Sequence, residues 1–557
     1  MSIRKDDRER TTDVDVVVIG GGVNGTGLAR DLTLRGLRVA LFEKHDLAFG
    51  ASGNSSGMIH GGPRYLLSHP KVTQQSCKDS GFIQAVAPHL LFRIPFLMPI
   101  LRKGLARRIY FDLMDAFFGA YDDYVPLKRG KPHTRLDGDE LLQLEPGLVG
   151  DFIGGVTFDE WGIDGARLCT LNAIDAEERG AELHTHCEIV ELIMRRDGDR
   201  RVVEGVRARD TRTGAIVNRT AKIVVNASGA WGPLFANIAG VPLRLRPGKG
   251  IHIVFDRRLT NYAIAANAID GRQVFLEPWQ SVSVLGTTDD DYYGDLDDVR
   301  ATGDEVRYLV QAIAQIFPAI RGARAVGVYT GVRPTLWGWG GIEDRLSREH
   351  EIVDHARGDR GGVAGLYSLI GGKLASYRLF AEEAADVVAR ELGVERACET
   401  HRLALPGGAD VPDALVIANH HDFTPIGARR LVYRHGSRAD RVLERVARAP
   451  AEARVVCACE PVTEAEVRHV VQHEHAVTVD DVSRRTRLGL GPCGGMRCAL
   501  RCGQIVAQET GATQRQGEAQ AIRFLDRQRR LRAPALGPDQ ARQEALAIAA
   551  LRAQTSR

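Results

Sequence analysis

Residues Asp15-Val-Val-Val-Ile-Gly-Gly-Gly-Val-Asn-Gly25, followed by Leu41-Phe-Glu43, decide the fold of this chain. The first stretch predicts a buried strand, a glycine turn and a helix, with Gly20, Gly22 and Gly25 at the glycine positions of a G-x-G-x-x-G motif. These glycines permit the sharp turn, the approach of a pyrophosphate and close helix–strand packing, and the helix N-terminus attracts phosphate. Glu43, 18 residues after Gly25, can accept from a ribose hydroxyl. The pattern predicts a dinucleotide-binding βαβ unit rather than a glycine turn without a ligand.

The segment that follows this unit favours FAD over NAD. The motif alone does not distinguish them, but its position at the start of a long chain suits a flavoprotein. Gly50-Ala-Ser-Gly-Asn-Ser-Ser56 is small and rich in hydroxyl groups, which can donate to phosphate and ribityl oxygens; the alternative is an ordinary flexible loop. We expect non-covalent FAD to contact residues of these and similar glycine-rich turns: Gly20, Gly22, Val23, Asn24, Gly25, Glu43, Lys44, Ser52, Asn54, Ser55, Ser56, Ile189, Ser228, Gly229, Gly372, Lys373 and Leu374.

Bulk composition is that of a globular protein with several domains. The 557 residues suggest about two to four domains. The net charge of +3, from 74 basic and 71 acidic residues, predicts no nucleic-acid partner. The charged N-terminus lacks the apolar core of a signal peptide, and no run of 18 apolar residues predicts a spanning helix.

The most apolar stretch lies at 90–101. It is short and interrupted by Arg93, Pro95 and Pro99, which favours a buried loop or strand. The alternative is a peripheral membrane contact, helped by Arg107, Arg108 and the aromatic segment 110–124.

The order of strand-like and helix-like patterns predicts four segments. Residues 1–395 alternate the two patterns, with a substrate-covering sheet at about 240–330 and a helix at 375–391. A helical connector is expected at 396–452, a cysteine module at 453–510 and a helical tail, broken at Pro534 and Pro538, at 511–557.

The cysteine module is the second functional signal. Cys457-Ala-Cys459 and Cys493-Gly-Gly-Met-Arg-Cys498 are separated by 33 residues that predict two short helices, the first opened by a capping box at Thr463–Glu466. Four thiolates suit a [2Fe–2S] cluster or zinc, and C-x-C is tight for a zinc knuckle. We therefore expect a [2Fe–2S] cluster, with zinc and unliganded thiols as alternatives; Cys502 is a spare helical residue. Nine cysteines in so long a chain predict no disulfide scaffold.

Several cationic side chains are candidates for an anionic substrate. Ile59-His-Gly-Gly-Pro-Arg-Tyr65 follows the hydroxyl-rich segment, so His60 is expected near the flavin and Arg64 and Tyr65 near the substrate. His252, Arg333 and Lys373 complete the set, because guanidinium and ammonium groups match phosphate or carboxylate. The histidines can instead be satisfied core residues, and Arg333 an ordinary salt-bridge partner.

These motifs, in this order, resemble those of the FAD-dependent glycerol-3-phosphate dehydrogenases, anaerobic A-subunit type. The resemblance is carried across most of the chain by 20–27, 55–66, Asn226-Ala-Ser-Gly-Ala-Trp231, Gly286-Thr-Thr-Asp289, Gly331-Val-Arg-Pro334 and 371–378. The cysteine module is similar to the bacterioferritin-associated-ferredoxin type of [2Fe–2S] domain. Pro63, Ala375 and Ser228 depart from the usual Leu, Thr and Thr.

The resemblance implies an α/β fold. It consists of a Rossmann-like FAD-binding domain of the glutathione-reductase or D-amino-acid-oxidase type, an α+β substrate domain and a small helical [2Fe–2S] domain.

The implied reaction is oxidation of sn-glycerol 3-phosphate to dihydroxyacetone phosphate by hydride transfer to flavin N5. His60 is the expected base with His252 as its rival, Arg64 and Arg333 hold the phosphate, and Lys373 steadies developing charge. Electrons are expected to pass through the cluster to quinone, directly or through partner subunits, at a cytoplasmic site on the inner face of the cell membrane. Alternatives are a flavin dehydrogenase or oxidase of another hydroxy acid or amino acid, and a non-catalytic electron-transfer protein.

Overall fold

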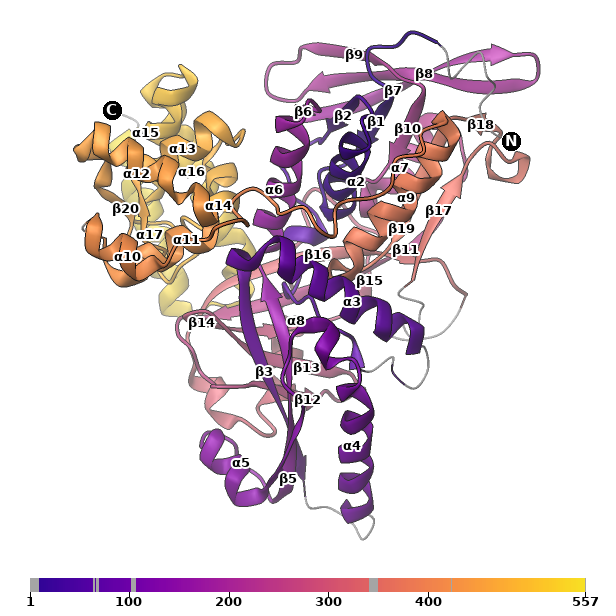
Figure 1. Ribbon diagram of the computed structural model, residues 1–557. Coiled ribbons are helices and arrows are strands. Elements are labelled where there is room, and N and C mark those ends of the chain that lie inside the picture. Colours follow the sequence, from indigo (N-terminus) through magenta and orange to yellow (C-terminus); the bar gives the residue numbers. More distant parts are fainter. Residues whose placement is uncertain are drawn as a thin grey trace.

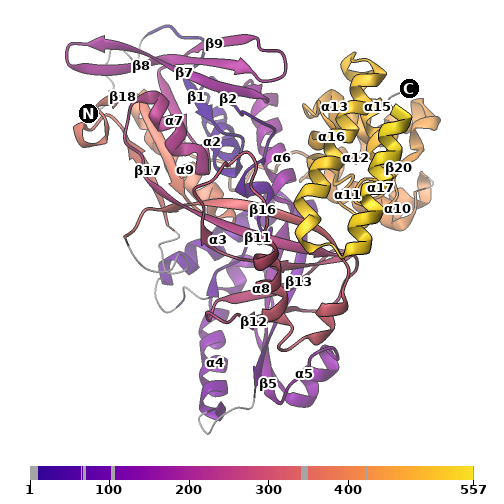
Figure 2. The same cartoon turned by 180° about the vertical axis from the view of Figure 1, so that it is seen from behind.

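The computed structural model describes residues 10–63, 66, 70–101, 107–339, 349–421 and 423–555. An α/β body built from most of the chain carries a helical body on one side, drawn in orange to yellow in Figure 1 and seen from behind in Figure 2. The predicted α/β fold with a substrate sheet and a helical C-terminal domain is confirmed at this level.

A six-stranded sheet forms the centre of the α/β body. Its strands run in the order β17-β19-β10-β1-β2-β6, parallel except at the antiparallel edge strand β17. The central strands β1 and β10 are valine-rich and fully buried because both of their faces are covered. The strands are β1 (Val16–Ile19), β2 (Val39–Phe42), β6 (Glu182–His184), β10 (Ile223–Asn226), β17 (His350–Asp354) and β19 (Leu366–Gly371).

Helices cover the six-stranded sheet. Helix α2 (Val23–Leu34), which follows the glycine turn, packs against α6 (Gly165–Glu178) and α9 (Tyr377–Leu392). Helix α9 lies where the spacing of 375–391 predicts it. The other helices of the α/β body are α3 (Pro70–Val86), α4 (Arg107–Asp122), α5 (Gly138–Leu144), α7 (Gly232–Ala239) and α8 (Gly303–Ile313).

A nine-stranded sheet covers the carboxyl side of the first sheet and extends downward in Figure 1. The mixed strands expected at 240–330 belong to it, and the apolar stretch at 90–101 is its strand β3, so the strand interpretation of that stretch is confirmed. Its strands are β3 (Leu91–Leu101), β4 (Thr134–Asp137), β5 (Phe152–Ile163), β11 (Leu245–Phe255), β12 (Ala263–Asn267), β13 (Gln273–Trp279), β14 (Val282–Gly286), β15 (Asp290–Asp291) and β16 (Ala325–Leu336).

A small sheet, antiparallel except for the β8–β18 pair, closes the opposite end of the α/β body. It contains the strands β7 (Cys187–Asp197), β8 (Arg200–Asp210), β9 (Ile216–Thr220) and β18 (Val363–Ala364).

The helical body has one continuous core under the cysteine module and the tail. Phe524, Leu525 and Ile548 of the tail are buried with Cys457 and Cys498. Its elements are α10 (Ala414–His420), α11 (Pro425–His435), α12 (Ala439–Arg448), β20 (Val455–Cys457), β21 (Val462–Thr463), α13 (Glu464–His473), α14 (Val479–Thr486), α15 (Ala499–Thr510), α16 (Gln514–Arg532) and α17 (Pro538–Thr555).

The capping box expected at the start of α13 is only half formed. Thr463 accepts from the Glu466 backbone N–H at 3.2 Å, but the Glu466 side chain turns into the core and pairs with Arg434. The Glu466 carboxylate therefore forms a tertiary ion pair instead of the hydrogen bond to the Thr463 N–H that a full capping box requires.

Within the described ranges, none of the helices combines the length and apolar character needed to span a bilayer. The peripheral membrane contact remains a prediction.

Candidate active site

A cavity of about 800 Å³ lies between the six-stranded and nine-stranded sheets. Its size is within the range of cofactor and ligand sites. Most residues predicted to bind cofactor or substrate line it: Gly20, Gly22, Val23, Asn24, Glu43, Lys44, Ser52, Ser55, Ser56, His60, Ile189, Ser228, Gly229, Arg333, Gly372, Lys373 and Leu374. The topology thus gathers segments that are more than 300 residues apart in the sequence.

The glycine turn is as tight as its motif predicts. Gly20 has φ of +114°, and a Cβ on it would lie 2.6 Å from the Ala227 carbonyl oxygen. A Cβ on Gly25 would lie 2.0 Å from the Gly20 carbonyl oxygen, so Gly25 serves helix packing and does not line the cavity. Side chains are excluded at both positions, and at Gly20 this leaves backbone facing the cavity.

The N-terminus of α2 opens onto the cavity. The Val23 N–H donates to Ser52 Oγ at 2.9 Å, which fixes the hydroxyl-rich segment against the helix. Asn24 Oδ1 is buried and has no hydrogen-bond partner within the described residues. An unsatisfied acceptor beside a helix N-terminus suits a ligand that brings both anionic and donor groups.

The acid at the end of β2 is held by backbone. Glu43 accepts from the Gly21 N–H at 2.6 Å and from the His45 N–H at 2.8 Å. Burial nevertheless raises the pKa of Glu43 above its usual range. The neighbouring Lys44 pairs with Asp297 at 2.5 Å, so its charge is shared with the protein.

Asn54 and His252, like Gly25, do not line the cavity. Asn54 donates from Nδ2 to the carbonyl oxygens of Phe49 and Gly50 at 2.8 Å, which ties its own loop together. His252 lies behind the cavity wall, with Nε2 2.8 Å from Ser56 Oγ. Arg64 and Tyr65 lie outside the described residues.

Arg333 reaches the cavity but is already paired. It donates from Nη1 to Asp289 Oδ1 at 2.8 Å and from Nη2 to Thr287 Oγ1 at 3.1 Å. A Cβ on Gly250 would lie 2.5 Å from Nη2, so the glycine makes room for the guanidinium. The salt-bridge alternative therefore describes part of the role of Arg333, and its 29% exposed side chain still faces the cavity.

His252 is neutral in this environment. Burial and the nearby Arg333 charge lower its pKa to about 3. Its ring stacks on Tyr329 with centroids 4.8 Å apart, and Nδ1 is buried with no hydrogen-bond partner in the described part of the chain.

Two groups at the cavity carry no sequence motif. Arg272 lines it and donates to the Asp289 carbonyl oxygen. Glu160 also lines it, pairs with the buried Lys128 at 2.9 Å and accepts from the Gly61 N–H at 3.2 Å, which positions the turn that carries His60. Glu160 comes from β5 and Arg272 from the turn before β13, and neither stands in a motif, so sequence spacing could not have identified them.

The four predicted metal-ligating cysteines come together as two pairs. Cys459 Sγ lies 3.7 Å from Cys493 Sγ. A hydrogen bond with Cys498, aided by backbone N–H groups that include Gly489, lowers the pKa of Cys457 to about 6. Cys502 is buried in α15, as expected of a helical core residue.

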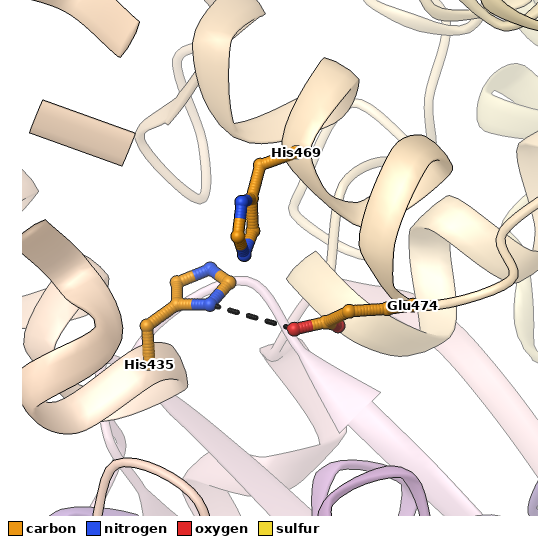
Figure 3. A group of neighbouring side chains, drawn as sticks. All are labelled: His435, His469 and Glu474. Carbon is orange, nitrogen blue, oxygen red and sulfur yellow. Dashed lines mark ion pairs between the residues drawn. The ribbon is translucent and has the colours of Figure 1, made fainter. Parts of the chain in front are cut away.

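A second group of potential metal ligands, His435, His469 and Glu474, is shown in Figure 3. Glu474 already pairs with Arg167 of α6, and His435 Nε2 lies 2.9 Å from Glu466, which also pairs with Arg434. Two arginines balance the two carboxylates, so a divalent cation would add uncompensated charge. This cluster fastens the helical body to the α/β body.

Two known families match this chain, one over the α/β body and one over part of the helical body. Residues 15–378 match the family described as FAD dependent oxidoreductase, and residues 398–517 match the C-terminal domain of alpha-glycerophosphate oxidase.

Similar proteins cover between about 70% of this chain and nearly all of it. The A subunit of the anaerobic glycerol-3-phosphate dehydrogenase from Escherichia coli K12 is 33% identical over 92% of this chain and 91% of its own length. The FAD complex of the glycerol-3-phosphate dehydrogenase from Bacillus halodurans superimposes with a TM-score of 0.73 and 25% identity, covering 94% of this chain and 96% of that one. Glycine oxidase from Geobacillus kaustophilus shares the fold over 71% of this chain and 99% of its own, with a TM-score of 0.52 and 23% identity.

Proposed function

Since this chain belongs to the FAD-dependent glycerol-3-phosphate dehydrogenases, we propose that it oxidises sn-glycerol 3-phosphate in the cavity and sends the electrons through its cysteine module toward quinone. The reaction removes a hydride from C2 and a proton from the C2 hydroxyl and yields dihydroxyacetone phosphate. Two electrons therefore leave the substrate in each turnover. The observation that carries the proposal is the gathering of glycine turn, histidine and cations around one cavity.

The residues at one end of the cavity fit FAD. The Asn24 acceptor, the α2 N-terminus and the Glu43 carboxylate offer partners for hydroxyl and phosphate groups. When bound, FAD would accept the C2 hydride. The protein supplies the rest, namely orientation, charge and proton removal.

His60 is the better of the two candidate bases. It lines the cavity, and the Glu160 network positions the turn beside it. His252 is screened by Ser56, and a side chain whose pKa is lowered to about 3 holds a proton weakly. We assign proton removal to His60 and a supporting role to His252, which orients Ser56 in the cavity wall.

Three cationic side chains of the cavity suit the phosphate. Arg333, Arg272 and Lys373 all line the cavity, and charge-assisted contacts from such groups bind phosphate strongly. Asp289 holds Arg333 in place, and the three cations around one cavity favour a dianion over a neutral polyol.

The cysteine pairs support a [2Fe–2S] cluster more than zinc. Two thiolates on one tetrahedral metal lie about 3.8 Å apart for a metal–sulfur bond of about 2.3 Å. The Cys459–Cys493 separation of 3.7 Å agrees with this. A single zinc requires all four sulfurs at that spacing, yet no three cysteines of the described chain have sulfurs within 4.8 Å of one another. Two pairs suit two metals, and such a cluster would carry single electrons.

Trp279 and Arg487 support a short path between the cavity and the cysteines. A Cβ on Gly57, which lines the cavity, would lie 3.6 Å from Trp279 Nε1. The Arg487 guanidinium lies 3.8 Å from the centre of the Trp279 ring, and its Nε is 3.6 Å from Glu460, the residue after Cys459. Electron tunnelling falls steeply with distance, so close packing here favours transfer.

The test is a comparison of substrates under anaerobic conditions. The purified protein is mixed with sn-glycerol 3-phosphate, lactate or glycine, and flavin absorbance is followed. We expect rapid bleaching by glycerol 3-phosphate alone. Bleaching by lactate or glycine instead would assign the site to another hydroxy acid or amino acid, and bleaching only by a reduced protein partner would support the electron-transfer alternative.

A further inference from the structure

The loop after β2 lies between the cavity and the helical body. Glu43, Lys44, His45 and Phe49 of this loop line the cavity. Its backbone is tied to the glycine turn, since the Ala48 N–H donates to the Gly21 carbonyl oxygen at 2.9 Å. Movement of the loop would therefore move both the acid and the turn that are expected to hold the nucleotide.

Asp46 points from this loop into the helical body. It accepts from Arg484 Nε at 2.8 Å and from Arg485 Nη2 at 2.7 Å, both on α14. The side chains of Asp46 and Arg485 are 0% exposed, and the two guanidinium groups hold the pKa of Asp46 well below its usual range although burial opposes this. Such a carboxylate is stable in the interior only while its partners are in place.

Arg485 also joins this pair to the cluster of Figure 3. Its Nε donates to the Glu474 carbonyl oxygen at 2.8 Å, and the Glu474 side chain pairs with Arg167 of the α/β body. The position of α14 is thus set by the same residues that fasten the two bodies together.

Phe49 gives a second contact of the same kind. One of its neighbours is His45, whose ring stacks on it at 3.9 Å. The guanidinium groups of Arg484 and Arg527, from α14 and α16, lie 5.8 and 5.4 Å from its centre. Cations over an aromatic ring are attracted to it, so the helical body also supports this part of the cavity wall.

We infer that the Asp46–Arg485 pair couples FAD affinity to docking of the helical body. Asp46 and Arg485 are positioning residues, because they fix the loop and touch neither the cavity nor the substrate. Coupling between two binding events is reciprocal, so bound FAD holds the helical body in place as firmly as the docked body holds FAD. A chain whose helical body is displaced would lose FAD. It would therefore not oxidise substrate when the cysteines are not in place to carry the electrons away. The inference needs FAD alone and stands whether or not the cysteines hold a cluster.

The experiment measures FAD binding to the full-length apoprotein by flavin fluorescence. Asp46→Asn keeps the shape of the side chain and removes its charge, and Arg485→Met removes the partner. We expect either variant to raise the FAD dissociation constant about tenfold or more, which is about 1.4 kcal/mol. The control is Arg438→Gln, which removes a pair with Glu178 across the same interface but away from the loop. We expect the control to stay within about twofold of the wild type.

Hydrogen exchange supplies a readout that a purely structural role would not change. In the wild type, FAD should slow amide exchange in α14, and in Asp46→Asn this protection should be lost while the apoprotein stays folded. If FAD does not change amide exchange in α14 of the wild type, the coupling is overturned. This result needs no variant, so it holds even if Asp46→Asn fails to fold. An unchanged FAD dissociation constant in a folded Asp46→Asn protein would overturn the coupling as well.

Discussion

The substrate sheet and the interface with the helical body both bury acidic side chains but surround them differently. Glu277 on β13 is 2% exposed, its Oε2 has no hydrogen-bond partner in the described residues, and burial raises its pKa to about 8. At the interface, Glu474 pairs with Arg167 of the α/β body, and Glu466, linked to it through His435, pairs with Arg434 inside the helical body. Both acids are buried, and these arginines lower the pKa of each to about 2.

The difference separates two tasks. The interface holds its acids ionised and paired, which fixes one body on the other. The cavity side keeps a neutral His252 behind its wall and, at the cavity itself, the Asn24 Oδ1 acceptor that a ligand can meet. If this division is correct, variants in the two regions should fail in different ways.

The largest expected effect separates substrate oxidation from electron exit. In Cys459→Ser, sn-glycerol 3-phosphate should still bleach the flavin at the wild-type rate, but quinone-linked turnover should be abolished because one cluster ligand is missing. Turnover with quinone and iron content are measured together. Cys502→Ala, in the same helical core, is the control and should keep both. Normal quinone turnover in Cys459→Ser would reject the relay.

Loss of the base should come next. His60→Gln should slow flavin reduction about 10²–10⁴-fold, the usual contribution of general base catalysis. We expect the wild-type rate to fall at low pH, and this fall should be absent in His60→Gln. It should persist in His252→Gln, because a pKa lowered to about 3 keeps His252 neutral throughout that range. The measurement is the stopped-flow rate of flavin reduction from pH 5 to 9. A low-pH limb that vanishes only in His252→Gln would reverse the assignment.

Arg333 gives a smaller, binding effect. Removing a charge-assisted contact costs about 1.5–3 kcal/mol, so Arg333→Ala should raise the KM for sn-glycerol 3-phosphate about 10- to 150-fold. Arg333→Lys keeps the charge but loses the fork that Asp289 orients, and its KM should be intermediate. Steady-state kinetics provide the values, and an Arg333→Ala enzyme with the wild-type KM would remove Arg333 from the phosphate site.

The smallest effect concerns stability. The pKa of Glu277 is about 8 in the folded chain against 4.5 for the ordinary group, so the folded state binds more protons than the unfolded state between these values. The contribution of the protonated Glu277 side chain to the free energy of unfolding is therefore fully present below about pH 4.5 and is lost as the pH rises through about 8.

The matching variant is Glu277→Gln, which cannot ionise. At pH 9 its free energy of unfolding should exceed that of the wild type by about 1–3 kcal/mol, and its unfolding temperature should be higher. At pH 5 the two proteins should differ little. Thermal unfolding at both pH values measures this. A difference that does not grow with pH would mean that Glu277 has a partner that keeps it ionised.

The two regions also differ in how far the sequence predicts them. The glycine turn, Glu43 and the cysteine pairs are local patterns whose physics is contained in a few neighbouring residues. The structure puts the glycine turn and Glu43 at the cavity and brings the cysteines together as two pairs. No such pattern identifies Asp46, Arg485 or Glu474. Asp46 and Arg485, for example, are more than 400 residues apart in the sequence and meet only after folding.

Site residues follow the same division. His60, Arg333 and Lys373 stand in recognisable motifs and line the cavity. Glu160 stands in a strand without a motif and Arg272 in the turn between β12 and β13, and both reach the cavity only once the nine-stranded sheet has formed. His252 has a motif but lies behind Ser56, because its strand turns that face to the protein interior.

Anaerobic titration of the purified protein with sn-glycerol 3-phosphate, read by visible absorption and electron paramagnetic resonance in the same samples, is the most direct test of the account. It predicts yellow protein whose flavin bands bleach while the signal of a reduced two-iron cluster appears. Colourless protein that takes up no added FAD, or a flavin that stays oxidised in excess glycerol 3-phosphate, would contradict it.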